Sequence, residues 1–146
     1  MGHTFTNHLY HIIFSTKERR PLIKENVREE LHKYLCGVAR NTHGKILNIG
    51  SVDDHLHILA RIKPSISVSD FVRTAKANSS RWASQHGYFD WQDGYSSFTV
   101  SQSVSPRVAG YVDRQAEHHR RVAYADELRL LLEKHEVEFH PDHYLD

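Results

Sequence analysis

Two periodicities of apolar residues alternate along the chain, and their order leaves few folds open. Short runs of β-forming residues predict strands, whereas apolar residues three or four positions apart predict amphipathic helices. The predicted order is strand, helix, strand, strand, helix, strand and then two more helices. The segments are residues 8–15, 24–41, 45–52, 55–62, 68–85, 96–101, 105–121 and 126–134. This order predicts an α+β fold, a ferredoxin-like β-α-β-β-α-β sandwich with an antiparallel sheet, whose third strand is central, and C-terminal helices.

Local signals mark several of the predicted boundaries. The Asp53-Asp54 pair predicts a tight turn that joins the second and third strands into a hairpin. Ser105 followed by Pro106 predicts a helix start, with the serine side chain as cap and the proline in the first turn. Residues 139–146 are expected to form a docked extension of low regularity.

Length and composition predict one globular domain over residues 1–146. A hydrophobic fraction of 39% and a charged fraction of 25% are typical of soluble proteins. No apolar run approaches the roughly 18 residues of a membrane span, and no signal peptide is recognisable, so we expect a cytoplasmic protein without a membrane partner. The one cysteine, Cys36, excludes a disulfide framework and is expected to be a small buried residue.

A net charge of +1 does not by itself indicate a nucleic-acid partner. Basic residues nevertheless gather locally, and local patches can bind phosphate without a high overall charge. The candidate DNA-binding residues are Lys17, Arg19, Arg20, Arg73, Lys76 and Arg81, and a further group near the C-terminal helices is Arg114, Arg120 and Arg121. On charge alone, a scattered and solvated surface is the preferred interpretation.

The predicted third strand carries a His-x-His pattern. His55 and His57 alternate with Leu56 and Ile58, so the two imidazoles point to one face of the strand and the apolar residues to the other. Two imidazoles on a rigid strand can bind one cation. A pair of half-exposed histidines without a ligand explains the same pattern, and taken alone it is the more frequent outcome.

A second pattern lies on the predicted helix of residues 105–121. Tyr111 and Gln115 are four positions apart and share a face, with His118 and His119 one turn further on. Taken alone, this pattern is also explained by a core tyrosine and a solvated amide.

Together the two patterns resemble the single-tyrosine HUH transposases of the insertion-sequence 200/605 group. That family combines a His-hydrophobic-His strand with a later helix of the form Tyr-x-x-x-Gln-x-x-His-His. The resemblance extends over nearly the whole chain. The segments that carry it are residues 7–17, 54–59, 91–101, 111–119 and 140–145.

The resemblance implies a role for each matching residue. Tyr111 would be the nucleophile, and His55, His57 and Gln115 would be ligands of a divalent metal. His118 and His119 would support the site. The implied reaction is metal-dependent cleavage and strand transfer of single-stranded DNA through a 5′-phosphotyrosine, which preserves the energy of the broken linkage for rejoining. Imidazole, amide and phosphate oxygen ligands favour Mg²⁺ or Mn²⁺ over structural zinc.

The resemblance further implies a homodimer in which each tyrosine helix can complete the partner's site, and single-stranded hairpin ends of a mobile element as substrate. The basic residues named above would then track the DNA backbone, and Trp82 or Trp91 could stack on bases, although the helical position of Trp82 favours the core. Three alternatives stay open: an HUH replication initiator or relaxase-type nickase, a domesticated DNA-binding regulator, and a histidine-rich metal buffer.

Overall fold

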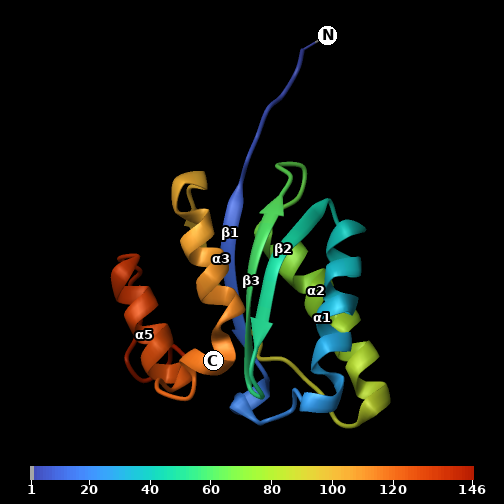
Figure 1. Cartoon of the computed structure of the whole chain (residues 1–146), viewed down its shortest axis with the longest axis vertical. Helices are drawn as coiled ribbons and strands as arrows, with labels where there is room; N and C mark the ends of the chain where they lie inside the picture. The colour runs from blue at the N-terminus through green and yellow to red at the C-terminus, as the bar shows by residue number, and fades with distance from the viewer. Residues whose placement is uncertain (1) are drawn as a thin grey trace.

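A four-stranded antiparallel sheet forms the centre of the computed structural model, which describes residues 2–146 (Figure 1). Its strands are β1 (Leu9–Ser15), β2 (Gly44–Ser51), β3 (His55–Ile62) and β4 (Ser96–Val100). Their order in the sheet is β2-β3-β1-β4, so β3 has a hydrogen-bonded neighbour on both sides. The predicted antiparallel α+β architecture and the central position of the third strand are therefore confirmed.

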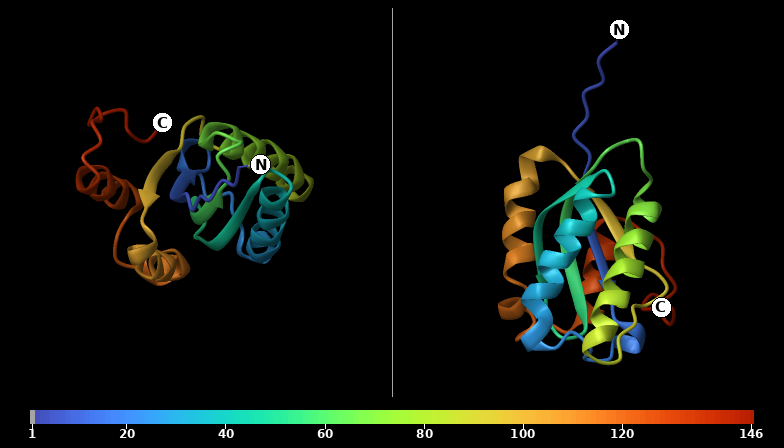
Figure 2. Two further views of the ribbon diagram at one scale, coloured as in Figure 1. Left: turned by 90° about the horizontal axis from the view of Figure 1, so that it is seen from above. Right: turned by 90° about the vertical axis from the view of Figure 1, so that its right-hand side faces the viewer.

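Two long helices cover one face of the sheet, α1 (Glu25–Arg40) and α2 (Val68–Ala83) (Figure 2). Their apolar faces bury Leu31, Leu35 and Phe71 against Ile12 and Ile58 of the central strands. At the start of α2, the Ser67 side chain accepts a hydrogen bond from the Asp70 backbone N–H and caps the helix. The apolar residues whose spacing predicted these helices are thus largely the residues that the helices bury or partly bury.

The other face of the sheet carries the C-terminal helices α3 (Ser105–Asp113), α4 (Gln115–His118) and α5 (Tyr124–Lys134). Alternation along β3 sends Leu56 and Ile58 toward α1 and α2, whereas His55 and His57 face the C-terminal helices. The prediction that the two imidazoles share one face is confirmed.

The helix predicted over residues 105–121 is interrupted. Arg114 has a non-helical backbone (φ −100°, ψ 25°) that separates α3 from α4. The apolar stripe of α3 ends at Val112, and the residues after it offer no apolar face to hold a straight helix on the sheet. The predicted Ser105 cap is wrong: Ser105 lies inside α3, and its hydroxyl donates to the carbonyl of Gln102. Pro106 does lie in the first turn.

The C-terminal tail docks as predicted. Phe139, Tyr144 and Leu145 pack against the apolar cluster beneath α5, and the Tyr144 hydroxyl donates to the carbonyl of Ala125 at 3.0 Å. Cys36 is free and half-buried at the edge of the main core, where burial raises the pKa of its thiol.

None of the helices within residues 2–146 combines the length and apolarity needed to cross a membrane.

Candidate metal centre

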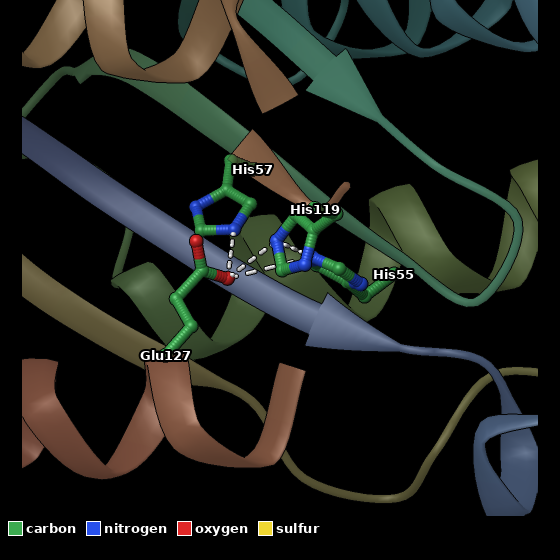
Figure 3. Close-up of side chains that lie close together, drawn as sticks. All are labelled: His55, His57, His119 and Glu127. Atoms are coloured by element: carbon green, nitrogen blue, oxygen red, sulfur yellow. Dashed lines mark hydrogen bonds and ion pairs between the residues drawn. The ribbon is translucent and has the colours of Figure 1, made fainter. Parts of the chain in front are cut away.

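Three imidazoles and one carboxylate meet between the sheet and the C-terminal helices. His55 and His57 come from β3, His119 directly follows α4, and Glu127 lies on α5. One ligand atom from each side chain lies within 4.8 Å of the others. Figure 3 shows the imidazoles gathered around the Glu127 carboxylate, which extends from α5 toward β3. This compact group of nitrogen and oxygen donors has the composition of a divalent metal site.

Distances within the cluster are those of direct contacts. Glu127 Oε1 lies 2.9 Å from His57 Nε2 and 3.0 Å from His119 Nε2. His55 Nε2 lies 2.9 Å from His119 Nε2 and 3.5 Å from Glu127 Oε1. His55, His57 and Glu127 are almost completely buried, so bulk water does not screen the charge of the carboxylate.

The amphipathic pattern of α5 explains why a carboxylate points inward. Glu127 lies three residues after Tyr124 and four before Leu131, and both neighbours pack against the sheet. A helix that buries this stripe also buries Glu127, which is 2% exposed. The carboxylate is satisfied there because histidines of β3 and α4 surround it, as a buried charge requires.

Electrostatic interactions within the cluster favour an ionised carboxylate. Burial raises the pKa of Glu127, but hydrogen bonds from His119, His55 and His57 outweigh it and hold the pKa below its ordinary value. Burial lowers the pKa of His57 to about 4 despite the carboxylate beside it. His57 is therefore a neutral imidazole near pH 7, which is the form that binds metal.

Both histidines of β3 have a partner on the ring nitrogen that points away from the cluster. Asp54 Oδ1 lies 2.7 Å from His55 Nδ1, and His11 Nε2 lies 2.8 Å from His57 Nδ1. His11 belongs to β1 and is buried, and this burial together with His57 lowers its pKa to about 3. Partners of this kind fix the tautomer and ring orientation of metal-ligating histidines.

Tyr111 reaches the same carboxylate from α3. Its hydroxyl donates to Glu127 Oε2 and lies 3.3 Å from His118 Nε2, which itself lies 3.0 Å from Glu127 Oε2. The Tyr111 ring centroid is 5.6 Å from that of His57. Burial, and then the hydrogen bond to Glu127, raise the pKa of the phenol above its ordinary value. The chain thus brings the predicted nucleophile next to the predicted imidazole pair.

Gln115 lies buried at the edge of this group. Its Nε2 donates to the backbone carbonyl of Tyr111 at 3.0 Å. Its Oε1 is buried and has no hydrogen-bond partner among residues 2–146. A buried amide oxygen without a partner is rare in proteins. Together with the clustered donors, it fits a divalent cation bound by His55, His57 and one or more of Gln115, His119 and Glu127.

The sequence interpretation left out two of the residues assembled here, Glu127 and His11. Glu127 lies within the predicted helix of residues 126–134, and its helical spacing from Leu131 and Tyr124 was the available signal. His11 lies two positions from both Leu9 and Ile13 on β1 and shares their face of the sheet, which is the face that carries the imidazole pair. His118 and His119 were expected to give support only, yet His119 is a full member of the cluster.

The candidate DNA-binding residues lie in two places, on α2 and in the turn after β1. Arg73, Lys76 and Arg81 are on α2, on the sheet face opposite the cluster. The Lys76 ammonium donates to the carbonyls of Gln92 and Gly94, and burial lowers its pKa to about 8. The ammonium donors of Lys76 therefore bind the loop that contains Gln92 and Gly94, and few of them remain to bind a DNA phosphate.

Residues Lys17, Arg19 and Arg20 form a short turn after β1 and are exposed. Lys17 lies 3.6 Å from Asp90, and Arg20 stacks over Tyr88. The suggestion that Trp91 stacks on bases is wrong, because Trp91 is 4% exposed and its indole N–H donates to Ser79. Trp82 is partly buried against the main core and stacks on Tyr34, as its helical position predicted.

Comparison with known proteins identifies the family. The model of the family described as "Transposase IS200 like" matches residues 4–115, which is more than half of the chain. The chain therefore belongs to the IS200-like transposase family. The matched residues include His55, His57, Tyr111 and Gln115 and end before His119 and Glu127.

Individual relatives agree with this assignment. The transposase for insertion sequence element IS200 of Salmonella typhimurium is 28% identical over 130 residues, 82% of this chain and 84% of the relative. The ISDra2 transposase TnpA of Deinococcus radiodurans is 24% identical over 119 residues, 73% of this chain and 82% of the relative.

Two solved structures share the fold. A crystal structure of a Deinococcus radiodurans protein assigned as a transposase has a TM-score of 0.63 at 23% identity and covers 79% of this chain and 96% of its own. A REP-associated tyrosine transposase bound to a REP hairpin has a TM-score of 0.64 at 14% identity and covers 84% of this chain and 74% of its own.

Proposed function

We propose that this chain cleaves and rejoins single-stranded DNA through a covalent bond between Tyr111 and a 5′-phosphate. The observation that carries the proposal is the position of the Tyr111 hydroxyl: it shares the Glu127 carboxylate with His57 and His119. A nucleophile beside a candidate metal site is an arrangement suited to metal-assisted phosphoryl transfer to an amino-acid side chain. The ferredoxin-like strand order, with the imidazoles on a central strand, agrees with this function.

The proposed cleavage step is a single nucleophilic displacement at phosphorus, in which each residue has a separate role. The Tyr111 oxygen forms the new bond to phosphorus while the bond to the 3′ oxygen breaks, and the departing oxygen takes a proton to become a 3′-hydroxyl. The nearest acceptor for the Tyr111 proton is Glu127 Oε2. A divalent cation at the site would polarise the scissile phosphate and offset its negative charge. Attack by a 3′-hydroxyl on the phosphotyrosine reverses these changes and rejoins DNA.

His55 and His57, with His119, Glu127 and Gln115 as further candidate ligands, would hold the cation. Three imidazoles favour Mn²⁺ over Mg²⁺, because Mg²⁺ prefers oxygen ligands and retains its water. Mg²⁺ stays a candidate ion because the carboxylate and the amide supply oxygen.

The proposed substrate is a single strand with a hairpin, as expected for the ends of a mobile element. The structural neighbour bound to a REP hairpin supports a hairpin substrate. Within one chain, Tyr111 already meets the imidazole pair, so we propose that each subunit acts in cis even if the protein forms a homodimer.

Covalent capture tests the proposal. The protein is incubated with labelled single strands that contain a hairpin, with Mn²⁺, and then denatured. We expect an adduct for the natural chain, none for Tyr111→Phe, and an undiminished adduct for Tyr88→Phe, whose ring lies on an exposed loop. An adduct that survives Tyr111→Phe would refute the assignment of the nucleophile.

A second labelled strand in the same reaction separates the alternatives. A transposase joins the captured 5′ end to the added 3′-hydroxyl, whereas a replication initiator or relaxase-type nickase accumulates the nicked adduct. A DNA-binding regulator or a metal buffer yields no adduct at all.

A further inference from the structure

A cavity of about 250 Å³ opens beside the tyrosine. It is lined by Tyr111, Arg114, Glu117, His118 and Arg121. The spacing of three or four residues between Tyr111, Arg114, His118 and Arg121 brings these side chains to one side of the α3–α4 segment. This cavity is separate from the donor cluster, but both include groups that contact the Tyr111 ring or its hydroxyl.

The charge of the cavity is positive. Arg114 and Arg121 contribute two guanidinium groups and Glu117 one carboxylate. Within residues 2–146 neither guanidinium forms an ion pair with a carboxylate within 4.0 Å. The Arg114 guanidinium instead lies across the glycine Cα of Gly110, where an added Cβ would be 2.8 Å from Nη1. Two arginines without a close ion-pair partner in the described part of the chain are available to an anionic ligand.

A second cavity that touches Tyr111 has a different character. It measures about 210 Å³ and exposes mainly apolar groups, among them those of Val122, Leu130 and Leu131. His118, Glu127 and Lys134 also line it. A ligand that extended from one cavity to the other past Tyr111 would therefore meet basic side chains in the first cavity and mainly apolar ones in the second. Phosphate groups are favoured in the arginine cavity, because a guanidinium binds phosphate oxygens through two parallel hydrogen bonds and is weakly hydrated.

We propose that Arg114 and Arg121 form a phosphate-binding subsite for single-stranded DNA, which holds a backbone phosphate adjacent to the scissile one. The inference rests on the proposed function, because the subsite would hold the DNA strand that Tyr111 attacks. The role of the subsite is to align that strand across the tyrosine, and a strand held by phosphates is bound without regard to base sequence. The basic residues on α2 are not required, since they lie on the other face of the sheet.

Salt dependence of binding tests the subsite directly. All measurements use the Tyr111→Phe background without divalent cation, and the probe is a 20-residue oligothymidylate followed by fluorescence anisotropy. Each phosphate contact on single strands contributes a slope of about −0.7 to the plot of log affinity against log salt. Arg114→Gln and Arg121→Gln should each make the slope shallower by about 0.7 and lower the affinity by about tenfold.

Arg107→Gln is the matched control, because Arg107 is exposed on α3 and does not line the cavity. Its slope and affinity should equal those of the background protein. Unchanged slopes in Arg114→Gln and Arg121→Gln, or an equal change in Arg107→Gln, would overturn the subsite.

A local readout guards against indirect effects on folding. Addition of the dinucleotide pTpT to 15N-labelled protein should shift the side-chain Nε–H signals of Arg114 and Arg121 and leave that of Arg107 in place. The reverse pattern, or no shift, would contradict the proposal. Neither measurement involves cleavage, so the two proposals can fail separately. Failure to capture an adduct would refute the proposed reaction, whereas unchanged arginine signals would refute only the phosphate-binding subsite.

Discussion

At the scale of single residues, each imidazole of β3 is oriented by a partner on the ring nitrogen that points away from the cluster. Asp54 binds the Nδ1 of His55, and His11 binds the Nδ1 of His57, so each Nε2 faces the cluster. At His55, a proton on Nδ1 that is donated to Asp54 leaves a lone pair on Nε2, which is the atom that a cation needs. These outer partners therefore matter to the site although neither contacts the Glu127 carboxylate.

Removal of one partner should weaken metal binding. We expect Asp54→Ala to lower the affinity for Mn²⁺ by about 10- to 100-fold, because the His55 ring loses its fixed tautomer. Asp54→Asn should lose less, since the amide oxygen can still accept the Nδ1–H bond. Asp53→Ala, which changes the neighbouring turn residue, is the control and should bind normally. Isothermal titration with Mn²⁺ gives the affinities, and equal values for all four proteins would refute the orienting role.

At the scale of elements, the closeness of α3 to β2 decides where the tyrosine lies. Gly50 on β2 is paired with His57 on β3 and faces the backbone of α3. A Cβ at this position would be 1.9 Å from the carbonyl oxygen of Val112, the residue after Tyr111. The helix can approach the sheet this closely only because the residue is glycine.

Gly50→Ala should therefore move the tyrosine without replacing a candidate ligand, although its Cβ would also lie 3.4 Å from Gln115 Cγ. We expect adduct formation to slow by about 100-fold, because a displacement of about 1 Å at a reacting group has that cost. Stability in urea should fall by about 1–3 kcal/mol from overpacking. Gly37→Ala on α1 is the matched control, since its Cβ would meet open space apart from an arginine tip at 4.0 Å. Normal adduct formation by Gly50→Ala would show that α3 does not fix the geometry.

The elements of the main sandwich were predictable from sequence because each carries its own periodicity. The β3 segment, residues 55–62, was predicted with its observed bounds, and α1, α2 and β2 differ from prediction by one or two residues at their ends. The break at Arg114 was not predicted, since it depends on where the sheet stops supporting the helix. The periodicity of a segment predicts which of its own residues are buried, but it does not predict which other element packs against them.

The same distinction holds for the site. His55, His57 and Tyr111 were found because their spacing matches a family pattern, and the structure brings them together. Glu127 was missed because a carboxylate on an amphipathic helix is most often solvated. Its burial depends on the docking of α5 against β3, which is a long-range contact. Trp91 was misassigned for the same reason, because its partner Ser79 lies on α2.

At the scale of the whole molecule, the two faces of the sheet have different tasks. Helices α1 and α2 cover one face of the sheet (Figure 2). That face holds the main core, whereas the other face presents histidines to the C-terminal helices. The chain returns to this second face after β4, and only then supplies Tyr111, His119 and Glu127. One chain thus contains every group that the proposed reaction uses.

This self-sufficiency predicts the outcome of a mixing experiment. A Tyr111→Phe subunit and a His55→Ala, His57→Ala subunit are each inactive, and a mixture should stay inactive if each chain acts in cis. Adduct formation on the hairpin strand is measured for the mixture after joint refolding, with the natural chain as the positive control. Recovery of about a quarter of the natural activity would mean that Tyr111 acts on the partner's metal site instead, because about half of the dimers would be mixed and each would contain one complete site of two.

The central claim is that the histidines of β3 share one cation with groups from the C-terminal helices beside Tyr111. Electron spin-echo measurements on Mn²⁺-loaded protein test it most directly, because they detect coordinated imidazole nitrogen. We predict one tightly bound Mn²⁺ per chain, with nitrogen couplings that disappear in the His55→Ala, His57→Ala variant together with most of the affinity. A bound Mn²⁺ without nitrogen couplings, or an affinity that this double substitution leaves unchanged, would contradict the claim.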